Sequence, residues 1–271
     1  MSQLLIDHEL QLRQYGFYGC LIFLLLVEEL LPKRRIHLAY KTRWTANFGL
    51  MLMHLMLLRI VMPWVGIELA FKLQYQQIGL FNRFPIPKLA GLIMGIVLLD
   101  GFKYLLHRLS HQLDFLWRLH RVHHTDVDFD VSTSVRHHPA EVMVGTLGEC
   151  LVIAIFGLSP ETLVIWAITG SSVDLFNHAN LSLPSQLDSA LRWLVVTPDM
   201  HRIHHSADQP ETDSNFSSFL SFWDKLFRTY RAKPELSHEN MLIGLEQWRQ
   251  PAEQSIFLLL LNPFYRKNDQ V

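Results

Sequence analysis

Long apolar stretches alternate with polar segments along the first two thirds of the chain. Five of them cover residues 15–31, 44–64, 89–106, 142–158 and 161–176. Each is close to the roughly 20 residues that a helix needs to cross a bilayer. Ser159 and Pro160 separate the last two, and because proline cannot continue a helix they predict a helical hairpin. The pattern predicts an all-α integral membrane bundle of about four to five apolar helices.

Basic residues between the first two stretches predict the orientation of the bundle. They are Lys33, Arg34, Arg35, Lys41 and Arg43. Since positive loops stay on the cytoplasmic side, counting crossings places the end of the third stretch there, and the end of the hairpin as well. The first stretch has no small-residue cleavage site before its basic run, so we expect it to remain in the protein.

Composition narrows the class of protein. A net charge of −1 and a pI near 7.0 give no reason to expect nucleic acid as a partner. Cys20 and Cys150 form no Cys-x-x-Cys pair, so we expect them to pack in apolar surroundings. A mean hydropathy of +0.15 suits a membrane base with a polar cap, but also a soluble all-α protein with these stretches as core helices.

We predict one membrane domain over residues 1–271 with three parts. Residues 1–88 form N-terminal transmembrane or interfacial helices, residues 89–232 a catalytic core, and residues 233–271 a C-terminal tail. The apolar run at residues 256–261 is too short to cross a bilayer.

Histidine is the anomaly of this composition, because eleven of the fifteen histidines lie between His107 and His205. The i, i+3 and i+4 spacings within their groups let several imidazoles share one face of a helix. The three groups are His107-x3-His111, His120-x2-His123-His124 and His201-x2-His204-His205.

These groups supply eight imidazoles, more than the four ligands of a tetrahedral zinc site, so the sequence predicts two metal ions. Imidazole binds iron, zinc, copper and nickel, and does not choose among them. A ligating histidine usually donates its second ring N–H to an acceptor. The nearby carboxylates are either such acceptors or exposed surface groups: Asp100, Asp114, Asp126, Asp128, Glu141, Asp174 and Asp199.

The three groups and their flanks resemble the histidine boxes of the fatty acid hydroxylase and sterol desaturase superfamily. The similar segments are Asp100-x3-Tyr104-x2-His107-Arg108, Leu116-Trp117-x2-His120-x-Val122-His123-His124, Arg136-x-His138-Pro139-x-Glu141, Thr197-Pro198-x2-His201 and Trp223-Asp224-x-Leu226-Phe227-x-Thr229. Together they cover most of residues 100–230. The chain departs from the pattern of this superfamily at Arg228, where members often have glycine. We therefore expect a glycine-dependent tight turn to be absent there.

The resemblance implies an integral membrane non-haem diiron enzyme acting on a sterol, fatty acyl chain, ether lipid or similar molecule. Carried over residue by residue, it makes these the catalytic iron ligands: His107, His111, His120, His123, His124, His201, His204 and His205. His178 matches an extra histidine between the second and third boxes, and we predict it as a ninth ligand, against a hydrogen-bonded core histidine.

The remaining histidines are weaker candidates. His138 precedes a proline and suits a structural turn equally well, and His137 is weaker still. We expect the histidines that match no box to be solvated or packed: His8, His37, His54 and His238.

A reduced diiron centre uses O2 to attack an unactivated C–H bond, giving an alcohol or, after loss of a second hydrogen, an alkene. The sequence does not separate these outcomes. It contains no Gly-x-Gly-x-x-Gly fingerprint and no Cys-x-x-Cys-His, so electrons must come from a separate electron-transfer protein or reductant.

Two other functions remain open. A two-zinc membrane hydrolase usually includes a carboxylate that bridges its metals, and the boxes contain none. A non-catalytic metal-binding or transport membrane protein would place its ligands inside the membrane helices, whereas these groups lie beyond the helix ends.

Overall fold

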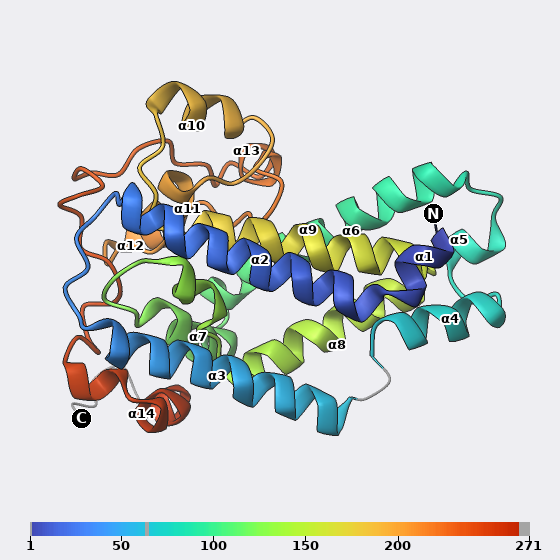
Figure 1. Cartoon of the computed structure of the whole chain (residues 1–271), viewed down its shortest axis with the longest axis horizontal. Coiled ribbons are helices and arrows are strands. Elements are labelled where there is room, and N and C mark those ends of the chain that lie inside the picture. The colour runs from blue at the N-terminus through green and yellow to red at the C-terminus, as the bar shows by residue number, and fades with distance from the viewer. Residues whose placement is uncertain (1, 63–64, 266–271) are drawn as a thin grey trace.

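The computed structural model describes residues 2–62 and 65–265, and within them the chain is all helical (Figure 1). No β-strand forms in this part of the chain, where extended pairing is limited to isolated bridges such as Val195 with Leu220. The N-terminal helices are α1 (Ser2–Asp7), α2 (Glu9–Leu30), α3 (Tyr40–Val61), α4 (Ile67–Tyr75), α5 (Leu80–Arg83) and α6 (Lys88–Gln112). They are followed by α7 (Asp114–His124), α8 (Pro139–Phe156), α9 (Pro160–His178), α10 (Ser185–Leu191), α11 (Pro198–His204), α12 (Gln209–Thr212), α13 (Phe222–Leu226) and α14 (Ile256–Leu261). The all-α prediction is confirmed.

Among the described residues, four helices are long and apolar enough to cross a membrane: α2, α3, α6 and α8. Each begins before the apolar stretch that predicted it, and α2, α3 and α8 also end before that stretch does. Helix α6 runs on to Gln112 and therefore carries both His107 and His111. The fifth predicted stretch forms α9, a helix of 19 residues that is not one of these four.

The outward surfaces of these helices are apolar. Phe23 and Leu26 of α2 are 62% and 63% exposed, and Leu151 of α8 is 64% exposed. Exposure of so many large apolar side chains to water would be unfavourable, whereas contact with lipid is favourable. The chain is therefore an integral membrane protein, and the soluble alternative fails.

Helices α8 and α9 form the predicted hairpin. Gly157 ends α8 with φ +67°, and a Cβ there would lie 2.8 Å from the carbonyl oxygen of Ile78, so only glycine fits this turn. The Ser159 hydroxyl then accepts the Thr162 N–H at 3.2 Å, and Pro160 occupies the first helical position.

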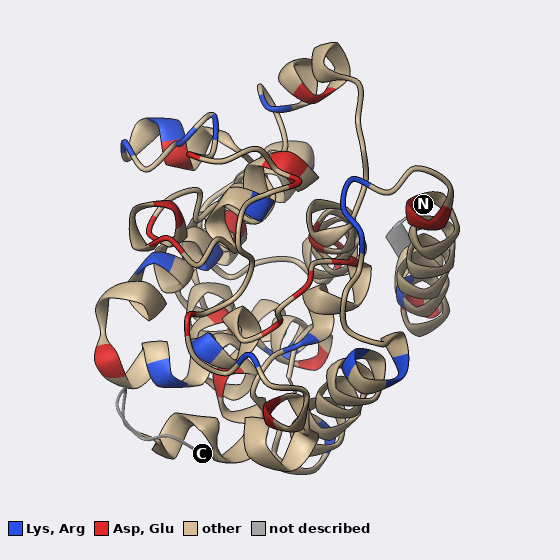
Figure 2. Ribbon diagram, turned by 90° about the vertical axis from the view of Figure 1, so that its left-hand side faces the viewer, with Lys and Arg blue, Asp and Glu red and all other residues tan. Residues whose placement is uncertain are grey.

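The long helices run side by side along the longest axis, and α7 and α10 to α14 gather at one end (Figure 1). We call this end, built from α7 and α10 to α14, the cap. The segment that joins α2 to α3 lies at the same end, whereas α4 and α5 lie at the opposite end. Figure 2 looks onto the cap, where charged residues are spread along loops and short helices. A polar cap on an apolar base explains the intermediate mean hydropathy.

A buried ion-pair network fastens the cap to α3. Arg43 donates from Nε and Nη2 to Asp126 at 2.7 and 2.9 Å, and from Nη1 to Asp130. All three residues are at most 1% exposed. Burial alone would raise the pKa of Asp126, but the charge and hydrogen bonds of Arg43 hold it at about 2. The segment after the second histidine group is thus tied to a membrane helix.

The expectation for Arg228 is wrong. Arg228 adopts φ +59°, the left-handed conformation that glycine usually supplies. The turn after α13 forms nonetheless, because the Thr229 N–H reaches the Asp224 carbonyl at 2.8 Å and the Thr229 hydroxyl donates to the Asp224 carboxylate at 2.7 Å. These bonds offset the steric cost of a side chain in this region, on the order of 1 kcal/mol.

Replacing Arg43 by methionine leaves two carboxylates buried without a counter-charge. We expect Arg43→Met to destabilise the protein by about 3–5 kcal/mol. The matched control is Arg118→Met, which removes a 36% exposed arginine paired with Asp114 and should change stability by less than about 1 kcal/mol. Thermal unfolding of both variants in one detergent measures this, and equal shifts would contradict the role of the network.

The segment that joins α2 to α3 and the third histidine group, on α11, lie at the same end of the molecule. We therefore predict that both lie on the cytoplasmic side of the membrane. With Cys20 and Cys150 replaced by serine, we expect Arg35→Cys and Asp208→Cys to resist an impermeant thiol reagent added to intact cells. Tyr75→Cys, 91% exposed at the opposite end, should react and serves as the control. Modification of Arg35→Cys or Asp208→Cys from outside would refute this topology.

Candidate metal centre

Four helices deliver the histidines to the base of the cap. His107 and His111 lie one turn apart near the end of α6, and α7 carries the second group. The third group lies on α11 and at its C-cap, His205. Helix α11 begins locally, with the Thr197 hydroxyl accepting the Met200 N–H at 3.3 Å and a proline at the first position. His178 is the last residue of α9.

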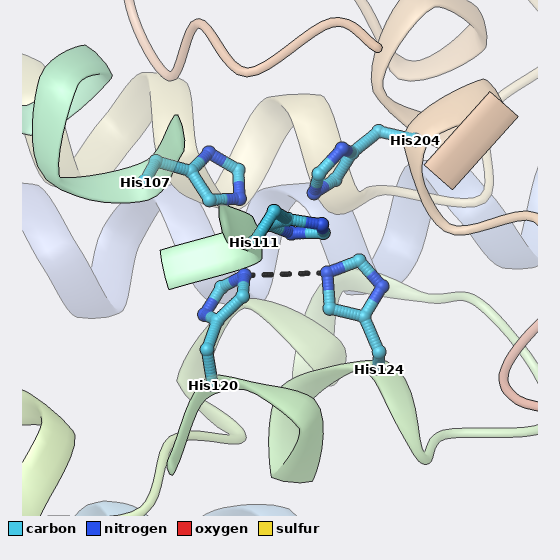
Figure 3. A group of neighbouring side chains, drawn as sticks. All are labelled: His107, His111, His120, His124 and His204. Atoms are coloured by element: carbon cyan, nitrogen blue, oxygen red, sulfur yellow. Dashed lines mark hydrogen bonds between the residues drawn. The ribbon is translucent and has the colours of Figure 1, made fainter. Parts of the chain in front are cut away.

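The nine predicted ligands separate into two sets of converging nitrogens. Within each set the nitrogens all lie within 4.8 Å of one another. The first, which Figure 3 shows pointing toward a common centre, is the five-histidine set: His107, His111, His120, His124 and His204. The second is the four-histidine set: His123, His178, His201 and His205. The second and third histidine groups contribute to both sets, whereas both members of the first group belong to the five-histidine set.

Hydrogen bonds on the outer side of the rings set their orientation. In six of the nine histidines, Nδ1 lies within hydrogen-bond distance of an oxygen acceptor, which leaves Nε2 directed inward with its lone pair. The acceptors are the carbonyls of Phe216 for His107 (2.7 Å), Arg136 for His123 (3.3 Å), Asp174 for His178 (2.7 Å) and Ser214 for His204 (2.8 Å), and the carboxylates of Asp213 for His111 (3.2 Å) and Glu141 for His120 (2.7 Å).

This arrangement brings lone pairs together. The Nε2 atoms of His123 and His178 lie 3.1 Å apart, although both rings have their N–H on the other side. The buried Nε2 atoms of His107, His111 and His204 have no hydrogen-bond partner in the described residues. Facing, desolvated lone pairs repel unless a cation lies between them, so the two sets fit metal ions.

Five of the imidazoles on the cap favour the neutral form that metal ligands need. Burial lowers the pKa of His123, His124, His201 and His205 well below the ordinary value, and neighbouring imidazoles lower it further. Burial likewise lowers the pKa of His204 to about 3. The protein therefore presents uncharged nitrogen donors at neutral pH.

Among the candidate acceptors, Glu141 takes the expected role through its side chain, since it accepts from His120 and lies 3.2 Å from His137 Nδ1. Asp174 contributes only its carbonyl. The other carboxylates bond elsewhere: Asp100 to Trp223, Asp114 to Arg118, Asp126 to Arg43, Asp128 to His37 and Asp199 to Arg202. Asp213 was missed because it lies 102 residues from His111 in sequence.

His137 and His138 differ. His138 caps α8, where its Nδ1 accepts the Ala140 N–H at 3.2 Å, so its role is structural. His137 stacks on His123 with ring centres 4.5 Å apart and lies with His120 and Glu141 in a further group that could hold a metal ion. Although burial lowers it, the Glu141 carboxylate raises the pKa of His137 above its ordinary value. Its place beside the four-histidine set was not evident from spacing.

A cavity of about 340 Å³ opens against the histidines. Rings of both sets line it, among them His107, His120 and His178, and it extends between α6 and α8 toward His54 of α3. Its size falls in the usual range for small-molecule sites, roughly 300–1,000 Å³. A ligand in this cavity would lie directly beside the nitrogen sets.

The fold and the site together define the class of membrane helix bundles whose histidines can bind metal. The model of the family described as fatty acid hydroxylase matches residues 92–229, about half of the chain. The chain belongs to this family.

Several characterised proteins are similar to the chain. The ornithine lipid hydroxylase OlsE of Rhizobium tropici is 28% identical over 182 residues, which cover 67% of this chain and 52% of that protein. The alkylglycerol monooxygenase of Xenopus tropicalis is 25% identical over 52% of this chain and 30% of its own length. Sphinganine C4-monooxygenase 1 of Arabidopsis thaliana is 28% identical over 51% of this chain and 53% of its own length.

The chain thus spans about half, or less, of the length of the curated relatives it matches. No solved structure matches it.

The position of His178 in the four-histidine set predicts its effect on metal content. We expect about two metal ions per chain in the wild type, and loss of metal in His178→Gln while the protein still folds and inserts. His138→Gln, which changes only a helix cap, should keep its full metal content. Elemental analysis of the monodisperse fractions checks this; full metal in His178→Gln would remove that residue from the site.

Proposed function

We propose that the chain is an O2-dependent non-haem diiron oxygenase that hydroxylates a C–H bond of a lipid. The observation that carries this proposal is the division of nine imidazoles into two adjacent nitrogen sets beside a cavity. Five and four nitrogen donors suit two metal ions, and together exceed what one tetrahedral ion accepts. We further propose residues 89–232 as the catalytic core and the cytoplasm as the side that the cap faces.

Iron is favoured by family membership, since imidazole alone does not select it. The names of the similar proteins describe hydroxylation or monooxygenation of lipids, namely ornithine lipid, alkylglycerol and sphinganine. They favour hydroxylation over desaturation as the outcome for this chain. The candidate substrate classes are a sterol, a fatty acyl chain and an ether lipid.

The bound iron pair would supply O2 activation and the removal of hydrogen from an unactivated C–H bond. The protein's own residues orient the ligands. Glu141 fixes the His120 ring and Asp213 the His111 ring, while backbone carbonyls fix the rings of His107, His123, His178 and His204. The cavity holds the reacting part of the lipid against these rings and limits access of water. Electrons would come from a separate electron-transfer protein or reductant.

The hydrolase alternative is less well supported. Both nitrogen sets consist of imidazole alone, and Glu141 meets His120 at Nδ1, on the side of the ring turned away from the five-histidine set. A two-zinc hydrolase would be expected to place a carboxylate between its metals. Transport is disfavoured because the histidines lie near the cap end of α6, at the end of α9, and on α7 and α11, rather than along a path through the bundle.

Expression of the chain in a host grown with 18O2 tests the reaction. We expect a lipid that gains one labelled oxygen atom only when both the gene and oxygen are supplied, and none with His204→Ala, which removes one predicted ligand. Arg118→Met, outside both nitrogen sets, is the control that should retain the product. Labelled product from His204→Ala, or no new lipid in any fraction of the wild-type cells, would overturn the proposal.

A further inference from the structure

Three charged residues line the cavity on its membrane side: Lys103 of α6, Glu149 of α8 and Asp174 of α9. We call them the charged triad. Two of them lie on helices long and apolar enough to cross a membrane. Ionisable groups are costly at such positions and mark functional sites, whereas a cavity for a hydrocarbon tail alone would have no use for them.

The charges of the triad do not balance. Lys103 Nζ lies 3.5 Å from Asp174 Oδ2, which pairs these two residues. The Glu149 carboxyl group lies near the Trp166 indole and is attracted by Lys103, but it has no ion-pair partner within 4.0 Å in the described residues. One lysine therefore serves two carboxyl groups, and Glu149 is the one that it does not pair with.

The triad lies close to the nitrogen sets. Lys103 and Asp174 each precede a predicted ligand, His107 and His178, by four residues on the same helix. That spacing is one helical turn, about 6 Å along the axis. Glu149 follows Glu141 by eight residues on α8, about 12 Å farther from the cap. Lys103 and Asp174 thus lie one turn from the nitrogen sets, and Glu149 lies deeper in the membrane part of the cavity.

We propose that the charged triad binds the polar end of the lipid, and that this end carries an amine. The inference rests on the proposed function, because it takes the cavity as the substrate site. An ammonium group complements the unpaired Glu149 carboxylate, whereas Lys103 and Asp174 hold each other and fix the wall around it.

Binding of simple amphiphiles tests this without turnover. Iron-loaded full-length protein, kept without an electron donor, is titrated with hexadecylamine, hexadecan-1-ol and hexadecanoate in one detergent, with tryptophan fluorescence as the readout. We expect the amine to bind about tenfold more tightly than the alcohol, the difference that one charge-assisted hydrogen bond provides. Hexadecanoate should bind more weakly than the amine.

Two glutamate variants of matched chemistry decide the assignment. Glu149→Gln should abolish the preference for the amine, whereas Glu68→Gln, on the exposed surface of α4, should leave it unchanged. No preference in the wild type, or a preference that survives in Glu149→Gln, would overturn the inference. Loss of iron from Glu149→Gln would also overturn it, because the carboxylate would then serve the metal centre.

A third variant keeps the inference testable where Glu149→Gln does not fold. Lys103→Met releases Asp174 and should strengthen the preference for the amine, and an unchanged or weaker preference counts against the triad. Because binding is measured without catalysis, an amine preference in a protein that hydroxylates no lipid would refute the proposed function but not the site. Lipid hydroxylation without amine preference would refute only the site.

Discussion

Nine imidazoles packed against one another impose the constraint on which this structure depends. Each ring loses its water, and six of them use one nitrogen on an outer acceptor, so the inner nitrogens face one another without protons. His123 and His178 meet in this way at 3.1 Å. Such an arrangement is stable when cations fill the space, and the surrounding shell of carbonyls and carboxylates holds the rings ready for them.

The sequence was sufficient for features that depend on local spacing. Helical periodicity placed His107 with His111 on one face, and the turn at Ser159 and Pro160 marked the hairpin. Contacts between distant segments were not accessible in this way. Asp213 reaches His111 across 102 residues, and Lys103 meets Asp174 across two helices, so no spacing rule connects them.

Local rules also misjudged two positions. The resemblance led us to expect no tight turn at Arg228, yet hydrogen bonds from Thr229 hold the left-handed conformation without glycine. His137 was ranked below His138, although it stacks on His123 and shares Glu141 with His120. In both cases the deciding interactions come from neighbours that a motif does not contain, which is why tertiary context overrides it.

The network around Arg43 has a consequence for biosynthesis. Helix α3 emerges from the ribosome before any predicted ligand, and its arginine has no partner until Asp126 and Asp130 follow. The last predicted ligand, His205, comes later still, so the chain must insert its first helices while this cation is uncompensated. The proposed metal ions can therefore acquire their full ligand set only after the membrane helices and both partners of Arg43 have been synthesised.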